Sequence, residues 1–173
     1  AEGTLAWLQA AANAFDIPAA RLQEVTAGPL ARAERALARY REQLADRTIS
    51  FLPDSQLELP LARFLSRECG MQLGEIGTPY LDQQMLAAET GWLPEGLAVI
   101  EGQDLDRQLD RIRAARPDLT VCGLGIANPL EAEGLRTKWS IELLFSPVQG
   151  FDQAGDLAEL FARPLHRQAT LGF

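Results

Sequence analysis

Cysteine and histidine are scarce in this sequence. Its 173 residues include two cysteines, Cys69 and Cys122, and one histidine, His166. The cysteines lie far apart and form no C-x-x-C pair, which argues against a disulfide scaffold and is typical of a reducing compartment. Cys122 lies in an apolar run and Cys69 near the end of a helical pattern, so we expect both thiols to be buried and structural. A single histidine excludes a His-rich metal site, and without a nucleophile motif beside it we expect His166 to be a solvated surface residue.

An excess of positive charge and long apolar runs are missing as well. The formal net charge is -8, whereas proteins that bind nucleic acids carry clusters of Lys and Arg that contact phosphates. Acidic surfaces are also repelled by anionic membranes. No apolar run approaches the roughly 20 residues that a transmembrane helix needs. We therefore expect no nucleic-acid partner and no membrane span.

The chain is helical in pattern from its first residues. It opens "AEGTLAWLQAAANAF", with neither an initiator Met nor a leader of basic start and apolar centre, so we expect a piece of a longer protein. Apolar spacing then predicts a short helix from Ala19 to Val25 and, after the break expected at Gly28-Pro29, a longer helix. Residues 1–46 are therefore predicted to be an all-helical lead-in.

Strand and helix patterns alternate over residues 47–173. Apolar runs rich in strand-forming residues predict five strands, at 48–53, 71–79, 97–102, 118–125 and 139–147. Helical spacing predicts helices over 55–69, 104–117 and 151–168, with Asp104 as an N-cap and Gly70 just past a helix end. This alternation predicts a Rossmann-like α/β domain, with a parallel sheet of about five strands and helices on both faces.

The fourth expected strand ends in two glycines, in "VCGLGIANPLE". A dinucleotide loop needs G-x-G-x-x-G after the first strand of its unit, but Asn128 stands where the third glycine would be. The loop has no P-loop lysine, and the glutamates of "PLEAE" would repel a phosphate at a helix N-terminus. We predict instead that Asn128 caps a helix with Pro129 at its first position. Gly123 and Gly125 would then let another segment or a flat ligand approach the strand end closely.

A second unusual stretch is "FSPVQGFDQAGD", just past the fifth expected strand. Apolar side chains in a turn are costly unless covered, and three covers remain open: the rest of this protein, a partner subunit or a ligand. Ligands of parallel sheets bind at the carboxyl ends of the strands. Three loops should converge there: "PDSQLELP", "GLGIANPLEAEG" and "FSPVQGFDQAGD".

None of these loops pairs a general base with a nucleophile, and their glycine, proline, amide and apolar groups suit a large flat ligand or a protein partner. We expect no catalytic and no metal-binding side chain in the chain. The candidate ligand-binding residues are Gly123, Leu124, Gly125, Asn128, Phe145, Ser146, Pro147, Val148, Gln149 and Gly150.

Three long stretches carry a family resemblance. They read "FLPDSQLELPLARFLSRECGM", "EGQDLDRQLDRIRAARPDLTVCGLGIANPLEAEG" and "TKWSIELLFSPVQGFDQAGDLAELFARPL". The sequence resembles the N-subunit family of light-independent protochlorophyllide reductase, a nitrogenase-like enzyme of chlorophyll and bacteriochlorophyll synthesis. The likeness runs from about Phe51 to Arg167 and includes runs too long to be generic to α/β folds. Its "VQGF" is more similar to the cyanobacterial branch than to the purple-bacterial one.

The resemblance implies an oxidoreductase that reduces a double bond of ring D of protochlorophyllide to give chlorophyllide. It implies an N2B2 heterotetramer with the B subunit, and an L protein dimer that hydrolyses ATP and donates electrons, in the cytoplasm or the plastid stroma. In the family, a 4Fe–4S cluster lies between N and B, held by three cysteines from the N-terminal part of N and a ligand from B, and the proton-donating acid belongs to B. Neither Cys69 nor Cys122 matches a cluster ligand, so we expect the cluster ligands outside this chain.

Two alternatives remain beside the enzyme-subunit interpretation. The chain is a scaffold domain that only assembles the oligomer, or it belongs to a related nitrogenase-like subunit that acts on chlorophyllide. The scaffold hypothesis predicts that changes in the loops alter assembly without affecting contacts to pigment.

Overall fold

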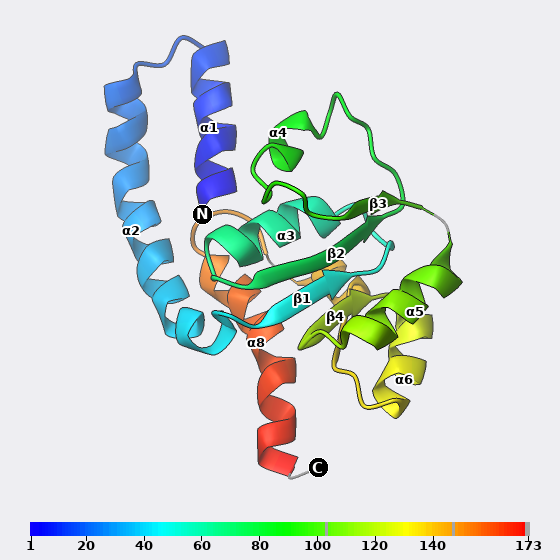
Figure 1. Ribbon diagram of the computed structural model, residues 1–173. Coiled ribbons are helices and arrows are strands. Elements are labelled where there is room, and N and C mark those ends of the chain that lie inside the picture. The colour runs from blue at the N-terminus through cyan, green and yellow to red at the C-terminus, as the bar shows by residue number, and fades with distance from the viewer. Residues whose placement is uncertain (103, 147, 172–173) are drawn as a thin grey trace.

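A five-stranded parallel sheet forms the centre of the protein. The computed structural model describes residues 1–102, 104–146 and 148–171, with 167–171 described by backbone alone (Figure 1). The sheet has the order β3-β2-β1-β4-β5, and every neighbouring pair is parallel. Its strands are β1 (Thr48–Phe51), β2 (Gln72–Thr78), β3 (Val99–Glu101), β4 (Leu119–Cys122) and β5 (Thr137–Trp139). The predicted parallel sheet is confirmed, and its chain order reverses between β1 and β4, the switch point of the fold.

Helices cover both faces of this sheet. The helices α3 (Glu58–Arg67) and α8 (Ala154–Leu171) pack on one face, and α5 (Leu105–Ala115) and α6 (Leu124–Ala132) on the other. Because side chains alternate along a strand, β4 contributes to two cores. Leu119 and Val121 belong to a larger core with α3 and α8, whereas Cys122 joins a smaller core with α5 and α6. The expected helical cover on both faces is therefore confirmed.

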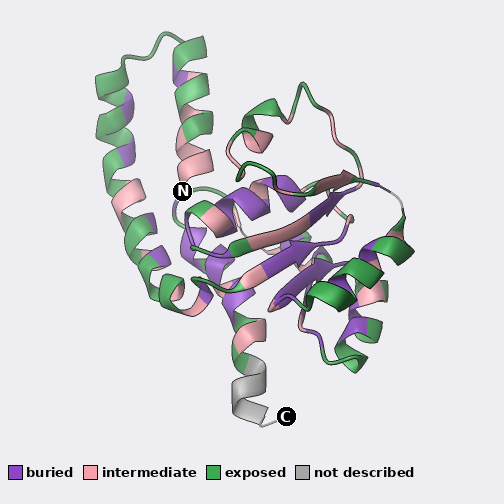
Figure 2. Ribbon diagram, viewed as in Figure 1, coloured by how far each residue is buried: buried purple, intermediate pink, exposed green. Residues whose placement is uncertain are grey.

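The helical lead-in is a hairpin of α1 (Glu2–Ala14) and α2 (Ala19–Leu44). Figure 2 shows that its far end is largely exposed, while β1, β4 and α3 are mostly buried. The expected break at Gly28-Pro29 is wrong, because α2 continues through Pro29. Proline removes only one backbone N–H from the helix, and burial of Ala33, Leu37 and Leu44 in the larger core stabilises the half that follows. The second half of α2 thus shares a core with the sheet. A domain boundary at residue 46 stays a prediction.

Two other helix signals are confirmed. Asp104 caps α5, and its side chain accepts a hydrogen bond from the backbone N–H of Arg107. Gly70 follows α3 with a φ of 78°, the left-handed conformation that favours glycine after a helix. The segment 80–94 contains only the short helix α4 (Ala87–Thr90).

The fifth strand is shorter than expected and a helix follows it. β5 ends at Trp139, and Ile141–Phe145 form the helix α7, so a strand over 139–147 is wrong. The reason lies in the neighbouring strand. β4 pairs with β5 only up to Cys122 and Trp139, and Gly123 then turns into α6, so residues after Trp139 have no strand to pair with.

The start of α6 also differs from the prediction. The helix begins at Leu124 with Gly123 as its N-cap, so Asn128 and Pro129 lie inside it, and their expected positions at its start are wrong. Pro129 is tolerated although it lacks an N–H, because Ala127 and Leu130 are fully buried in the smaller core and hold this turn in place.

Candidate functional site

Three strand ends meet at the switch point of the sheet. Asp54 follows β1, Gly123 follows β4 and Ser140 follows β5. The Ser140 hydroxyl donates to the Asp54 carboxylate, and the backbone N–H of Ser140 donates to the carbonyl oxygen of Cys122 at 3.1 Å. Ser140 is only 2% exposed, and its bond to the exposed Asp54 links the loop after β1 to the segment before α7.

Gly123 is needed for the approach of Asp54. A Cβ atom at Gly123 would lie 2.8 Å from Oδ1 of Asp54, closer than normal side-chain contact. The carboxylate therefore lies beside the start of α6, where unpaired N–H groups and the helix dipole favour an anion. The expected close approach of another segment is confirmed for Gly123. In a dinucleotide-binding fold a phosphate would take this place, which here holds a carboxylate of the protein itself.

The loop that carries Asp54 is fixed by a buried carboxylate. Glu58 is 2% exposed, and its Oε1 accepts from the backbone N–H groups of Asp54 at 3.0 Å and Ser55 at 2.6 Å. Its Oε2 accepts from the hydroxyl of Thr78 at 3.3 Å. Hydrogen bonds to a charged group are the stronger ones, so Glu58 ties the ends of β1 and β2 and sets the position of Asp54.

Exposed apolar side chains follow the carboxyl ends of the strands. We call this set the apolar rim; it consists of Tyr80, Met85, Leu124, Trp139, Ile141, Leu144 and Phe145. Phe145 is 84% exposed and Met85 82%. Among the residues whose side chains are described, the other large exposed apolar ones lie on or beside the α1–α2 hairpin: Trp7, Phe15, Ile17 and Val25. Apolar side chains at the ligand-binding edge of a parallel sheet indicate a surface that the rest of the protein, a partner subunit or a ligand covers.

The predicted residues of the α6 loop lie as follows. Leu124 is exposed at the first position of α6 and belongs to the apolar rim. A Cβ at Gly125 would meet no atom within 4 Å, so this glycine borders open space. Asn128 is exposed in the middle of α6.

The predicted residues of the second loop divide between surface and core. Phe145 ends α7 rather than a strand, and the Ser146 hydroxyl closes that helix by donating to the carbonyl oxygen of Glu142 at 2.8 Å. Val148 packs against the larger core. The remaining three are Gln149, exposed with its N–H bonded to Gln153, Gly150, with a φ of 80° that suits the expected turn, and Pro147, which lies outside the described residues.

Of the three loops, two are joined by contacts in the structure. The loops after β1 and β4 meet at Asp54 and Gly123. Within the described ranges no hydrogen bond joins 145–150 to 123–128, so their convergence stays a prediction.

Sequence reasoning missed three polar residues at this edge, Asp54, Lys138 and Ser140. Lys138 is the only lysine of the chain, its side chain is 4% exposed, and it forms an ion pair with Glu142 of α7. A lone lysine among arginines was the signal for this position. No such signal marks Asp54 or Ser140, which are 86 residues apart in the sequence.

The cysteines do not fit an iron–sulfur cluster. Both are buried and free, and burial raises the pKa of each thiol to about 12, whereas cluster ligands are thiolates. Among the described residues no group of three or more His, Cys, Asp or Glu side chains is placed to hold a metal ion. This part of the chain therefore offers no cluster site. Nor does any described helix combine the length and the apolar character needed to cross a membrane.

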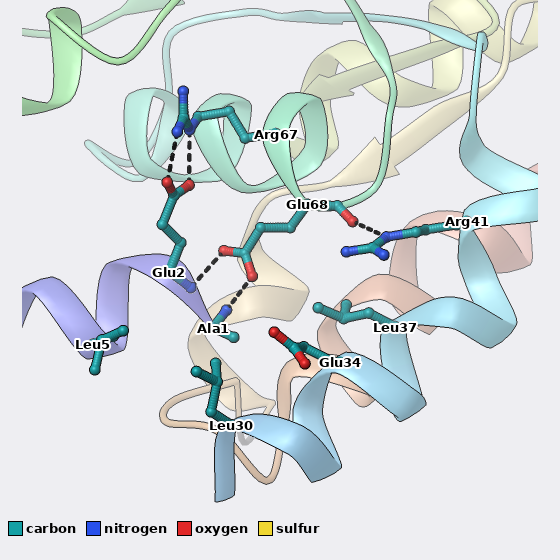
Figure 3. Close-up of a pocket in the computed structure, with 9 residues that line it drawn as sticks. All are labelled: Ala1, Glu2, Leu5, Leu30, Glu34, Leu37, Arg41, Arg67 and Glu68. Carbon is teal, nitrogen blue, oxygen red and sulfur yellow. Dashed lines mark hydrogen bonds and ion pairs between the residues drawn. The ribbon is translucent and has the colours of Figure 1, made fainter. Parts of the chain in front are cut away.

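A hollow of about 540 Å³ lies between α1, α2 and α3 (Figure 3). Glu2 and Glu68 have partners within the hollow: Glu2 pairs with Arg67 at 2.6 Å, and Glu68 accepts from the backbone N–H of Glu2 at 3.0 Å. Arg41 donates to the carbonyl oxygen of Glu68 at 2.6 Å. Because Glu68 comes after α3 and shortly before β2, the hollow lies towards the amino ends of the strands, away from the apolar rim.

Known proteins are similar to this chain in sequence and in fold. The chain is 66% identical over 170 residues to the light-independent protochlorophyllide reductase subunit N of Rhodopseudomonas palustris (strain BisB5). It is 65% identical over 170 residues to the subunit N of Halorhodospira halophila. Each alignment covers 98% of this chain and 40% of the relative, so the chain spans about two fifths of the length of these curated relatives.

A solved structure, nitrogenase Cp1 at pH 5, matches with a TM-score of 0.77 at 15% identity, over 97% of this chain and 40% of that one. This likeness confirms the fold. The model of the family described as nitrogenase component 1 type oxidoreductase matches residues 1–166. The chain therefore belongs to the nitrogenase component 1 type oxidoreductase family.

Proposed function

We propose that this chain is part of the catalytic N–B component of light-independent protochlorophyllide reductase. In this proposal the complex reduces ring D of protochlorophyllide to chlorophyllide with electrons from an ATP-dependent iron–sulfur reductase. The observation that carries it is the 66% identity, over 98% of this chain, to a protein named subunit N of that enzyme. Its partners would be the B subunit, in an N2B2 heterotetramer, and the L protein dimer.

The role proposed for this chain is binding rather than proton transfer. A chlorin-type macrocycle is flat and largely apolar, and sites for such ligands are lined by apolar and aromatic side chains. The apolar rim offers that surface through Leu124, Trp139 and Phe145. The Ser140 hydroxyl is hydrogen-bonded to Asp54, whereas the chain's single histidine, His166, is hydrogen-bonded to Gln43 at 2.7 Å, so no Ser-His-Asp triad is formed among these residues. The chain's residues would therefore hold the pigment and exclude water.

The cluster of the complex would lie outside this chain, because its two thiols are buried and protonated. A location in the cytoplasm or the plastid stroma and a place in the cyanobacterial branch of the family stay predictions. The relatives named above come from Rhodopseudomonas and Halorhodospira.

The test replaces Phe145 in the full-length subunit. Phe145→Asp puts a charge against the pigment surface, where burial of an unpaired charge costs several kcal/mol. We expect N–B assembly to survive, because Phe145 is 84% exposed here, and turnover of protochlorophyllide with the L protein and ATP to be lost. Phe145→Leu keeps an apolar wall and should retain activity. Asp106→Ala, on the solvated face of α5, serves as the unaffected control.

The outcomes separate the candidate functions. Phe145→Asp complexes that turn over pigment normally would show that this residue is no pocket wall and would favour the scaffold hypothesis. A failure to assemble would assign Phe145 to the subunit interface. A wild-type complex that reduces chlorophyllide but not protochlorophyllide would favour the related nitrogenase-like reductase.

A further inference from the structure

The chain's single lysine occupies a buried position. Lys138 lies in β5 opposite Val121 of β4, which belongs to the larger core under α3 and α8. Its side chain is 4% exposed, and an ammonium group in such a place is costly unless it is paired. All other cationic side chains apart from His166 are arginines. This position thus holds a compact ammonium in a chain that elsewhere uses the larger guanidinium.

Lys138 forms an ion pair with Glu142, whose side chain is 43% exposed. Glu142 belongs to α7, a helix of five residues that is too short to be stable alone. Its only buried side chain is that of Leu143. Polar interactions also hold α7. Ser140 before the helix is hydrogen-bonded to Asp54 and to the carbonyl oxygen of Cys122, the Ser146 hydroxyl after it donates to the Glu142 carbonyl, and Lys138 pairs with Glu142.

The helix held in this way carries three members of the apolar rim. Ile141 is 41% exposed, Leu144 59% and Phe145 84%. The ion pair joins this exposed surface to the interior of the sheet, because Lys138 lies in a strand and Glu142 in the helix. We therefore expect a change in the pair to alter the position of these side chains, since Glu142 itself is not a member of the larger core.

We propose that Lys138 and Glu142 are positioning residues that fix α7, and with it Ile141, Leu144 and Phe145, against a flat apolar macrocycle. This inference rests on the proposed function and deepens it. Neither residue is assigned a contact with the reacting atoms. Both act through the apolar side chains of α7, so their effect belongs to ligand binding rather than to the chemical step.

The experiment uses the full-length subunit with Glu142→Gln, assembled with the B subunit and assayed with the L protein, ATP and protochlorophyllide. We expect the KM for pigment to rise about tenfold, equivalent to about 1.4 kcal/mol, with kcat within about twofold of wild type. Backbone amides of residues 141–146 should exchange hydrogen faster in the pigment-free complex. Lys138→Arg, which keeps the charge but not the compact group, should act in the same direction.

The matched control is Glu24→Gln, which removes a surface ion pair with Arg21 on α2 and should change neither KM nor exchange. If the wild type is active and the KM is unchanged in both Glu142→Gln and Lys138→Arg, the positioning role is overturned and the proposed function stands. If the wild-type complex does not turn over protochlorophyllide, the proposed function fails. In that case, hydrogen exchange of the backbone amides of residues 141–146 tests whether the ion pair holds α7. Exchange rates equal to those of the wild type in the two variants would overturn this. If neither variant assembles, the pair serves folding and the positioning role is also overturned.

Discussion

Replacement of Gly123 by alanine tests the arrangement of the switch point directly. The backbone at Gly123 has φ −67° and ψ 156°, which alanine adopts without strain. Any cost must therefore come from the new Cβ, which would lie 2.8 Å from Oδ1 of Asp54. The Asp54 side chain would have to move, and its movement would break the hydrogen bond from Ser140.

The change in the free energy of unfolding can be worked out from three contributions. A hydrogen bond to a charged group contributes about 1.5–3 kcal/mol, and an anion beside a helix N-terminus about 0.3–1 kcal/mol. Because Asp54 is exposed, we use the lower end of each range. Against this, Gly→Ala at a compatible position stabilises by about 0.4–1 kcal/mol through the unfolded chain. We expect Gly123→Ala to lower the free energy of unfolding by about 1 kcal/mol.

The cost of the same substitution should fall when Asp54 is absent. In an Asp54→Ala background no side chain opposes the new Cβ, so only the N-cap preference for glycine over alanine and the opposing gain of about 0.4–1 kcal/mol through the unfolded chain remain. Urea unfolding of the four chains, followed by far-UV circular dichroism, gives the coupling free energy of this double-mutant cycle. Gly125→Ala is the control, since its Cβ would meet nothing within 4 Å, and it should stabilise in both backgrounds. An equal effect of Gly123→Ala in the two backgrounds would refute the contact with Asp54.

Two further predictions concern titrating groups. Burial raises the pKa of the Cys69 and Cys122 thiols to about 12 from 9.0, so neither should react with a thiol reagent at pH 8 unless the chain is unfolded in urea. The stability linked to these protonated thiols should be complete below pH 9 and be lost as the pH rises towards 12. Burial alone would raise the pKa of Asp118, but hydrogen bonds from the N–H and hydroxyl of Thr48 and the charge of Arg47 lower it overall from 3.8. The stabilising effect of the Asp118 carboxylate should be complete above its ordinary pKa of 3.8 and should be lost as the pH falls through the lowered pKa. The difference in unfolding free energy between wild type and Asp118→Asn should therefore shrink in acid. A difference that does not change with pH would contradict this prediction.

The sheet was predictable because its strands are marked locally. β1 and β4 are short runs of mostly apolar and β-branched residues followed by turn residues, and helical patterns occur between most of the strands. Helix ends with a side-chain or glycine signal were also predictable, as at Asp104 and Gly70. These features depend on residues a few positions apart, which a sequence shows directly.

The errors arose where distant residues decide the local structure. Residues 141–145 have the composition of a strand, but a strand needs a neighbour, and β4 ends before it could supply one. Likewise α2 continues through Pro29 because its second half packs in the larger core, which the sequence of the helix alone does not reveal. In both places tertiary contacts outweigh local preference.

The glycine pair in "VCGLG" shows how one motif can report a constraint without naming its cause. Glycine after a buried strand indicates that something approaches the backbone closely, and a phosphate is the familiar occupant. The sequence argued against phosphate through the following glutamates, but it could not supply the actual occupant. Asp54 lies 69 positions before Gly123 in the chain and reaches it only because β1 and β4 are neighbours in the sheet. The two glycines also differ, since Gly125 borders open space beside the exposed Leu124. One glycine thus admits a side chain of the protein, and the other leaves room at the apolar rim for the proposed ligand.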